Sequence, residues 1–133
     1  MNAESSATEA VVRNHLQAFL EQRGIPAIVD DYDESAQFFN EARIYRGKHE
    51  IGGFFTGFID SLPAGAIDRF SLTSLLVDGG IAYITWHVED EIPLGTDTFV
   101  VQNGKIVSQT FAMHSLPTPE MRLDQYRSAG ATP

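Results

Sequence analysis

The chain has 133 residues, enough for one domain with a substantial core and too few for two. Eighteen acidic residues against nine basic residues give a formal net charge of −9, which repels nucleic-acid backbones and anionic membrane surfaces. The absence of cysteine excludes a disulfide framework and a thiolate zinc site, and we expect no other metal or cofactor.

Hydrophobic residues make up 43% of the chain, and nine of them are phenylalanine, which favours a large aromatic core or cavity. The first ten residues contain neither the basic nor the apolar region of a secretory signal, and no run approaches the length of a membrane span. We therefore expect a cytoplasmic protein whose partner is a small apolar or carbonyl-containing molecule, not nucleic acid or a membrane.

The first predicted helix extends from about Thr8 to Arg23, where apolar residues recur at helical spacing, and residues 1–7 are expected to be a flexible N-terminus. His15 lies in the middle of the apolar face. Two interpretations stay open for it. It is either a core histidine whose ring is satisfied by a backbone carbonyl, or a functional group that points into a pocket.

A short second helix is expected from Ala27 to Asp33, because Pro26 precedes it, with an acidic cluster that faces water. Two short extended segments, 36–40 and 43–46, lead to a third helix from about Lys48 to Ser61. The acidic cluster lacks the glycine and the spacing of a calcium loop.

The rest of the chain predicts strands. Residues 67–77 and 81–91 form one hairpin around Asp78-Gly79-Gly80, and residues 95–115 form another around Gln102-Asn103-Gly104. Helices followed by an antiparallel meander indicate an α+β domain, here residues 8–115, with the helices on one face of the sheet. We expect the tail, residues 116–133, to be loose or ordered only against a partner subunit.

The last hairpin has one polar group on each apolar face. Asp97 shares a face with Phe99 and Val101, since side chains alternate along a strand. The returning strand places Gln109 on a face with Val107, Phe111 and Met113. This pattern is typical of a lined pocket, and also of an ordinary sheet. For residues 81–91, the sequence leaves open which face, the one with Trp86 or the one with His87, looks inward.

The order of these elements, together with the stretch TDTFVVQNGKI, resembles the nuclear-transport-factor-two-like superfamily, in particular its SnoaL-like and ketosteroid-isomerase-like members. The resemblance covers about residues 8–115. It implies a cone-shaped α+β barrel, in which three N-terminal helices pack in the concave face of a curved mixed or antiparallel sheet, around a pocket. It also implies a homodimer through the outer sheet face. Function does not follow, because this fold hosts isomerases, cyclases, hydrolases and non-catalytic modules.

Ketosteroid isomerases use an Asp base, with a Tyr and a protonated Asp that bind the oxyanion. His15 stands where the resemblance implies the Tyr, and Asp97 where it implies the protonated Asp. The base position falls at Asn40, whose amide cannot abstract a proton, unless a shifted register gives that role to Glu41. We therefore expect no classical ketosteroid isomerase activity. Limonene epoxide hydrolases need a second acid on the last strand, which offers none here.

The candidate site combines these residues. His15 and Asp97 are the predicted catalytic pair, sharing a proton if they meet, and Asn40 would orient a carbonyl or a water. The expected ligand-binding residues are otherwise mostly aromatic: Phe54, Phe58, Trp86, Phe99, Gln109, Phe111 and Met113. Two functions stay open: an isomerase, cyclase or lyase that acts on an apolar carbonyl compound, and a pocket or dimeric interaction module without chemistry.

Overall fold

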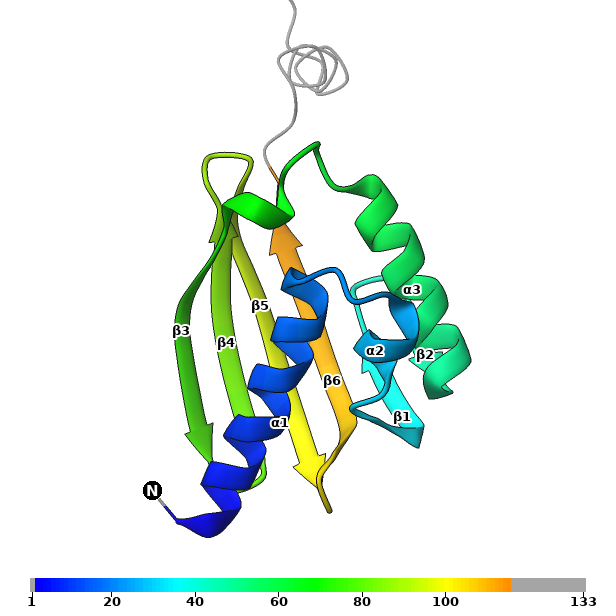
Figure 1. Cartoon of the computed structure of the whole chain (residues 1–133), viewed down its shortest axis with the longest axis vertical. Coiled ribbons are helices and arrows are strands. Elements are labelled where there is room, and N and C mark those ends of the chain that lie inside the picture. Colours follow the sequence, from blue (N-terminus) through cyan, green and yellow to red (C-terminus); the bar gives the residue numbers. More distant parts are fainter. Residues whose placement is uncertain (1, 116–133) are drawn as a thin grey trace, which may run out of the picture.

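The computed structural model describes residues 2–115, in which three helices lie against one face of a six-stranded sheet (Figure 1). The helices are α1 (Ala3–Leu20), α2 (Ile25–Val29) and α3 (Gly47–Ser61), and a short 3-10 helix, η1 (Ile67–Arg69), leads into the later strands. The strands are β1 (Tyr32–Phe39), β2 (Ile44–Arg46), β3 (Phe70–Asp78), β4 (Ile81–Val88), β5 (Ile92–Gln102) and β6 (Lys105–His114). The predicted α+β class is confirmed.

The sheet is mixed, curved and open. Its strand order is β2-β1-β6-β5-β4-β3, and every neighbouring pair is antiparallel except β1 and β6, which are parallel. The pairings β1–β6, β3–β4, β4–β5 and β5–β6 each contain a register shift. Such bulges bend a strand and increase its twist. The sheet therefore curves around the helices (Figure 1) without closing into a complete barrel.

Helix α1 begins earlier than its apolar spacing indicates. Asn2 caps it by accepting a hydrogen bond from the backbone N–H of Ser5 at 2.8 Å, so residues 3–7 are helical and the prediction of a flexible start was wrong for them. The hydroxyl of Ser5 accepts from the Gly79 N–H, and that of Thr8 donates to the Gly79 carbonyl. These bonds attach the start of α1 to the turn between β3 and β4.

The second helix is shorter than predicted. It ends at Val29, and the stretch expected to continue it contains the start of β1 at Tyr32. Tyr32, Ala36 and Phe38 are fully or almost fully buried. Ala36 and Phe38 share a face by alternation, whereas Glu34, at the same even spacing, is exposed because the pairing with β6 shifts register between Tyr32 and Gln37. Strand pairing and burial of this face thus override the apparent continuation of a helix.

The last hairpin forms as predicted, with Asn103 and Gly104 at positive φ of 52° and 76° in its turn. On β5 the face that carries Asp97 is buried, as expected. On β6 the alternation changes near the turn, because β5 pairs first with Ser108 and then with Ile106, which skips Val107. Ile106 is buried in its place.

Strand β4 turns one face to the helices, which resolves the open alternative: Ala82, Ile84, Trp86 and Val88 are buried. The predicted tail lies outside the described residues. Within residues 2–115, no helix is both long enough and apolar enough to span a membrane.

Candidate functional site

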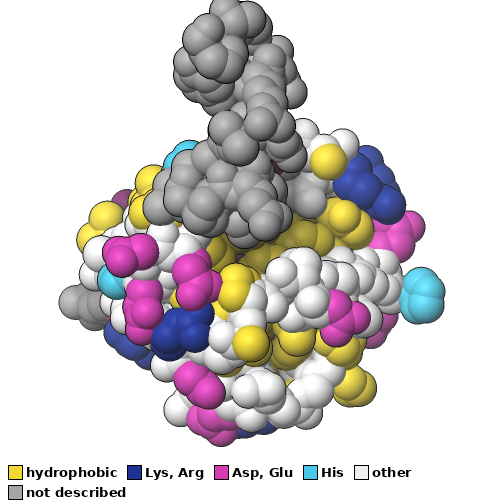
Figure 2. Space-filling model, turned by 90° about the horizontal axis from the view of Figure 1, so that it is seen from above, with side chains coloured by type: hydrophobic (Ala, Val, Ile, Leu, Met, Phe, Trp, Pro, Cys, Tyr) yellow, Lys and Arg dark blue, Asp and Glu magenta, His cyan; other side chains and the backbone are white. Residues whose placement is uncertain are grey.

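A cavity lies between the helices and the inner face of the sheet. Its volume is about 50 Å³ for the centre of a water-sized sphere, whereas one water needs roughly 10–15 Å³ by this measure. The segment around η1 contributes Ala66, Ile67 and Phe70 to the lining. At this end of the molecule hydrophobic side chains gather in a hollow (Figure 2). The cavity as it stands fits a small organic molecule, and a larger ligand requires side chains to move.

The cavity wall is largely aromatic. Eight of the nine phenylalanines of the chain line it, which accounts for their high number in the sequence. The expected lining residues Phe54, Phe58, Trp86, Phe99, Gln109 and Phe111 are all present, as are His15 and Asp97. Further lining residues that the sequence did not single out include Phe19, Phe38, Phe55 and Phe70.

Among residues 2–115, Asp97 is the only acidic residue that lines the cavity, and no lysine or arginine of this range joins it there. Its carboxylate accepts two hydrogen bonds, from Nε1 of Trp86 to Oδ2 and from Nε2 of Gln109 to Oδ1, both at 2.8 Å. Burial raises the pKa of Asp97 to about 6, and these two bonds oppose the rise. At neutral pH the carboxyl is therefore mostly ionised and close to its midpoint.

Tyr32 extends this network beyond Gln109. Its hydroxyl donates to Oε1 of Gln109, which orients the amide so that the N–H side faces Asp97. Burial raises the pKa of Tyr32 well above its ordinary value, and the nearby charge of Asp97 adds to this effect. Tyr32 thus remains a neutral donor, and it supports the ionised form of Asp97 through Gln109.

His15 is held at the other end of the network. Its Nδ1 lies 3.2 Å from the carbonyl oxygen of Ile28, which only accepts, so the proton of the neutral ring is on Nδ1. Burial lowers the pKa of His15 to about 4, and the bond to Ile28 opposes this shift. At neutral pH Nε2 therefore carries a lone pair, 3.5 Å from the Tyr32 hydroxyl oxygen.

His15 and Asp97 line the same cavity, as predicted, but the hydrogen bonds from Asp97 run through Gln109 to Tyr32 and end there: the Tyr32 hydroxyl donates its proton to Gln109 and lies 3.5 Å from Nε2 of His15, which carries a lone pair. Burial favours the neutral form of both groups, so it lowers the pKa of His15 and raises that of Asp97. An ion pair between them would shift each pKa in the opposite direction. The ring of His15 bonds a backbone carbonyl, as the first interpretation expects, and it also lines the cavity; a functional role for it stays a prediction.

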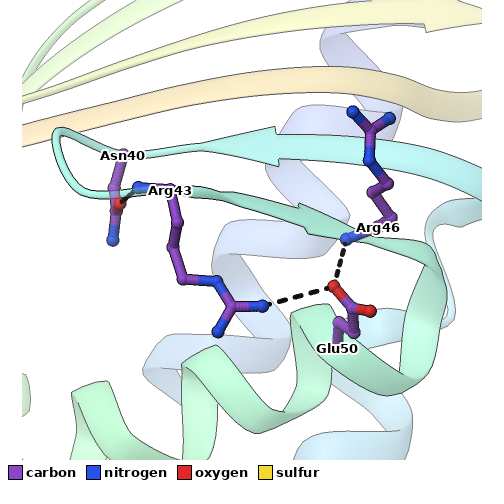
Figure 3. Close-up of polar contacts among 4 residues, drawn as sticks. All are labelled: Asn40, Arg43, Arg46 and Glu50. Carbon is purple, nitrogen blue, oxygen red and sulfur yellow. Dashed lines mark hydrogen bonds and ion pairs between the residues drawn. The ribbon is translucent and has the colours of Figure 1, made fainter.

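Asn40 does not reach the cavity, so this part of the predicted site was wrong. Strand β1 ends at Phe39, and the Asn40 side chain turns back to accept from the backbone N–H of Ala42 and from that of Arg43, the latter shown in Figure 3. Nearby, Glu50 holds the start of α3 by accepting from the Arg46 N–H. The side-chain oxygen of Asn40 is therefore bound within an Asx-type turn. Glu41, the alternative base, is exposed.

Met113 is half-buried and packs against the core without lining the cavity, which also departs from the prediction. Its cross-strand partner is Gly95, over which the Trp86 ring lies. Tyr32 is the member of this hydrogen-bond network that the sequence reasoning missed. Its signal in the sequence is that it is the aromatic residue within the acidic stretch from Asp30 to Glu34.

No family model and no curated protein matches the sequence. Solved structures do match. An NTF2-like protein of unknown function from Burkholderia xenovorans LB400 has a TM-score of 0.70 at 16% identity, over 92% of this chain and 95% of that one. Another from Mesorhizobium loti has a TM-score of 0.69 at 19% identity, over 86% and 97%.

A candidate ketosteroid isomerase from Kribbella flavida matches with a TM-score of 0.64 at 19% identity, over 87% of this chain and 84% of that one. At such identities the likeness concerns the fold and not the chemistry. It agrees with the three helices, the curved open sheet and the order of elements described above. The chain therefore has the nuclear-transport-factor-two-like fold that its sequence resembles.

Proposed function

We propose that the cavity binds a small, mainly apolar carbonyl compound, and that Asp97 transfers a proton to or from it in an isomerase-, cyclase- or lyase-type reaction. One observation carries the proposal: an ionisable carboxyl with a pKa of about 6 lies in an aromatic cavity that has space for a ligand. A general base is most effective when its pKa is near the working pH, and burial is a common way to reach such a value.

In this reaction the ionised Asp97 accepts a proton from the carbon next to the carbonyl group. The carboxyl then holds the proton and returns it to another position of the same substrate. His15, neutral and with a free lone pair on Nε2, serves as a second acceptor for a substrate hydroxyl or a water. The aromatic wall binds the apolar body and limits access of bulk water, which strengthens electrostatic interactions at the carboxyl.

Hydrogen exchange at carbon tests this proposal without knowledge of the natural substrate. Cyclohexanone, acetophenone and cyclohex-2-enone are incubated with the protein in D₂O, and deuterium uptake next to the carbonyl is followed by NMR. The wild type should accelerate uptake for at least one compound that binds, and Asp97→Asn should not. Binding is followed independently by the fluorescence of Trp86, the single tryptophan of the chain, which lines the cavity.

A second candidate function is ligand binding without chemistry, and one observation favours it. Both oxygens of Asp97 and the Nδ1 of His15 already have hydrogen-bond partners within the protein. The network is thus satisfied without a ligand that reacts. If a compound quenches Trp86 fluorescence but the wild type never accelerates its deuterium uptake, the binding function stands and the catalytic one fails. Recovery of a copurifying molecule unchanged would agree with that outcome.

A further inference from the structure

Gly95 on β5 has no side chain, and the Trp86 ring occupies the space that a side chain there would fill. The two residues are cross-strand partners, and a Cβ added to Gly95 would lie 2.1 Å from Cε2, 2.2 Å from Cζ2 and 2.5 Å from Cδ2 of the indole. Contacts this short do not occur in real side chains. Gly95 is not among the residues with positive φ, so its backbone accepts any L residue. The requirement for glycine comes from the indole alone.

The indole has little freedom to take another position. Phe70 stacks on it at a centroid distance of 5.2 Å, and Phe111 lies parallel to it at 6.3 Å with an interplanar angle of 1°. Trp86 is almost completely buried. A side chain at position 95 would therefore displace the ring from this aromatic arrangement instead of moving it slightly within it.

The position of the ring also determines a hydrogen bond to the acid. With the indole flat against the β5 backbone at Gly95, its Nε1 lies 2.8 Å from Oδ2 of Asp97, two residues further along the same strand. Gln109 provides the other donor, from β6. Within the part of the chain that the structure describes, the indole is thus one of two groups that stabilise the ionised carboxylate, and no lysine or arginine lines the cavity.

We propose that Gly95 is a positioning residue for Asp97: its missing side chain lets the Trp86 indole lie across β5 and direct its N–H to the carboxylate that the cavity uses as acid or base. The role of Gly95 in catalysis rests on the proposed function. Its role in setting the charge of Asp97 does not.

The groups that face Asp97 come from four elements. Trp86 on β4 and Gln109 on β6 donate to it directly, while Tyr32 on β1 and His15 on α1 are the titratable groups further along the network. Tyr32 stays neutral across the accessible pH range and His15 loses its proton near pH 4. Removal of the Trp86 donor should therefore appear as an upward shift in the ionisation midpoint of Asp97 itself.

The test is a ligand-free titration of the Asp97 carboxyl carbon by ¹³C NMR in four proteins: wild type, Gly95→Ala, Trp86→Leu and the double variant. Loss of one hydrogen bond to a charged group should raise the midpoint by roughly one pH unit in each single variant. Because both changes remove the same donor, the double variant should shift no further than Trp86→Leu. Gly53→Ala is the matched control, since a Cβ there meets no atom within 4 Å, and it should leave the midpoint unchanged.

Three results would overturn the positioning role: an unchanged midpoint in folded Gly95→Ala, additive shifts in the double variant, or a Gly95→Ala defect in folding that Trp86→Leu does not relieve. If Gly95→Ala unfolds but the double variant folds, the indole is the cause and the proposal stands. Because no ligand is present, these outcomes are independent of deuterium uptake. Failure of the proposed function is thus distinguishable from failure of this inference.

Discussion

Gln109 places its Nε2 2.8 Å from Oδ1 of Asp97 and turns its Oε1 to the hydroxyl of Tyr32. An ionised carboxylate only accepts hydrogen bonds, so the charge on Asp97 determines the orientation of the amide and, through it, the direction in which Tyr32 donates. A neutral group at position 97 that donates to Gln109 would allow the amide to turn over. Tyr32 could then donate to Nε2 of His15 instead. The network thus couples the protonation of Asp97 to the hydrogen bonding of His15.

The first prediction concerns Asp97→Asn. In the wild type the pKa of Asp97 rises from 3.8 in the unfolded chain to about 6, so the folded state is penalised when the carboxyl is ionised. The penalty is absent below pH 3.8, grows as the pH rises, and is complete above pH 6, where it reaches about 3 kcal/mol. Asn avoids it. The variant should therefore be more stable than the wild type at pH 8 by about 1–3 kcal/mol, measured by urea unfolding.

At pH 4 this difference should nearly vanish, because the wild-type carboxyl is then largely protonated. A stability gain of equal size at pH 4 and pH 8 would show that packing, and not the charge, is responsible. Such a gain would also contradict the raised pKa on which the proposed function depends.

The second prediction concerns His15→Asn, which keeps a donor near the Ile28 carbonyl. The pKa of His15 falls from 6.5 in the unfolded chain to about 4 in the folded protein. The folded state therefore loses stability as the pH falls below 6.5, by about 3 kcal/mol once the pH is below 4. The variant should lack this loss, although lost contacts with Phe55 and Phe99 lower its stability at every pH.

The informative measurement is the slope of the unfolding free energy against pH, not its absolute value. Between pH 4 and 6 the contributions of His15 and Asp97 have opposite signs and similar size, so they should nearly cancel in the wild type. Asp97→Asn should then become less stable on acidification, and His15→Asn more stable. Parallel curves for the two variants would disprove this balance.

The third prediction concerns Tyr32→Phe, which removes only the hydroxyl. Oε1 of Gln109 then loses its donor, at a cost of about 1–2 kcal/mol in unfolding free energy, and the amide is no longer held toward Asp97. The pKa of Asp97 should rise as a result, measured by carboxyl ¹³C NMR. Tyr45→Phe is the matched control, because the Tyr45 hydroxyl makes no hydrogen bond among the described residues, and it should leave the Asp97 pKa unchanged. Equal effects of both substitutions would show that the Asp97 pKa responds to a general loss of packing and not to the Tyr32 hydroxyl.

Much of this site follows from the sequence, and the part that does not has physical causes. Alternation along β5 is local, so the inward position of Asp97 could be predicted together with that of Phe99. His15 could be predicted from helical spacing. The prediction for Asn40 required β1 to continue for one more residue. The strand ends before it instead, because the Asn40 side chain bonds the backbone of the next turn.

The route from His15 to Asp97 was beyond sequence reasoning for a different reason. It depends on the parallel pairing of β1 with β6, which brings Tyr32 and Gln109 together across 77 positions of the chain. Nothing in the local pattern of either strand specifies that partner. The space over Gly95 has the same origin, since it reflects the register of β4 against β5.

The fourth prediction concerns self-association, for which we propose a homodimer through the outer face of the sheet. Three large apolar side chains lie together there and are exposed: Leu76 by 65%, Ile81 by 53% and Tyr83 by 39%. Leu76 pairs with Tyr83 across β3 and β4, so they form a continuous patch. Such a patch commonly marks a protein interface. Sedimentation equilibrium should show a dimer for the wild type and a monomer for Leu76→Glu combined with Tyr83→Lys.

Thr98→Lys on the same face tests whether the contact extends onto β5, where Thr98 is the neighbour of Tyr83. Substitution of the exposed Glu41 by lysine, in the turn between β1 and β2, changes surface charge away from the patch and should leave the dimer intact. The homodimer proposal is wrong if the wild type is monomeric at about 0.1 mM, a concentration at which weak transient dimers are still populated.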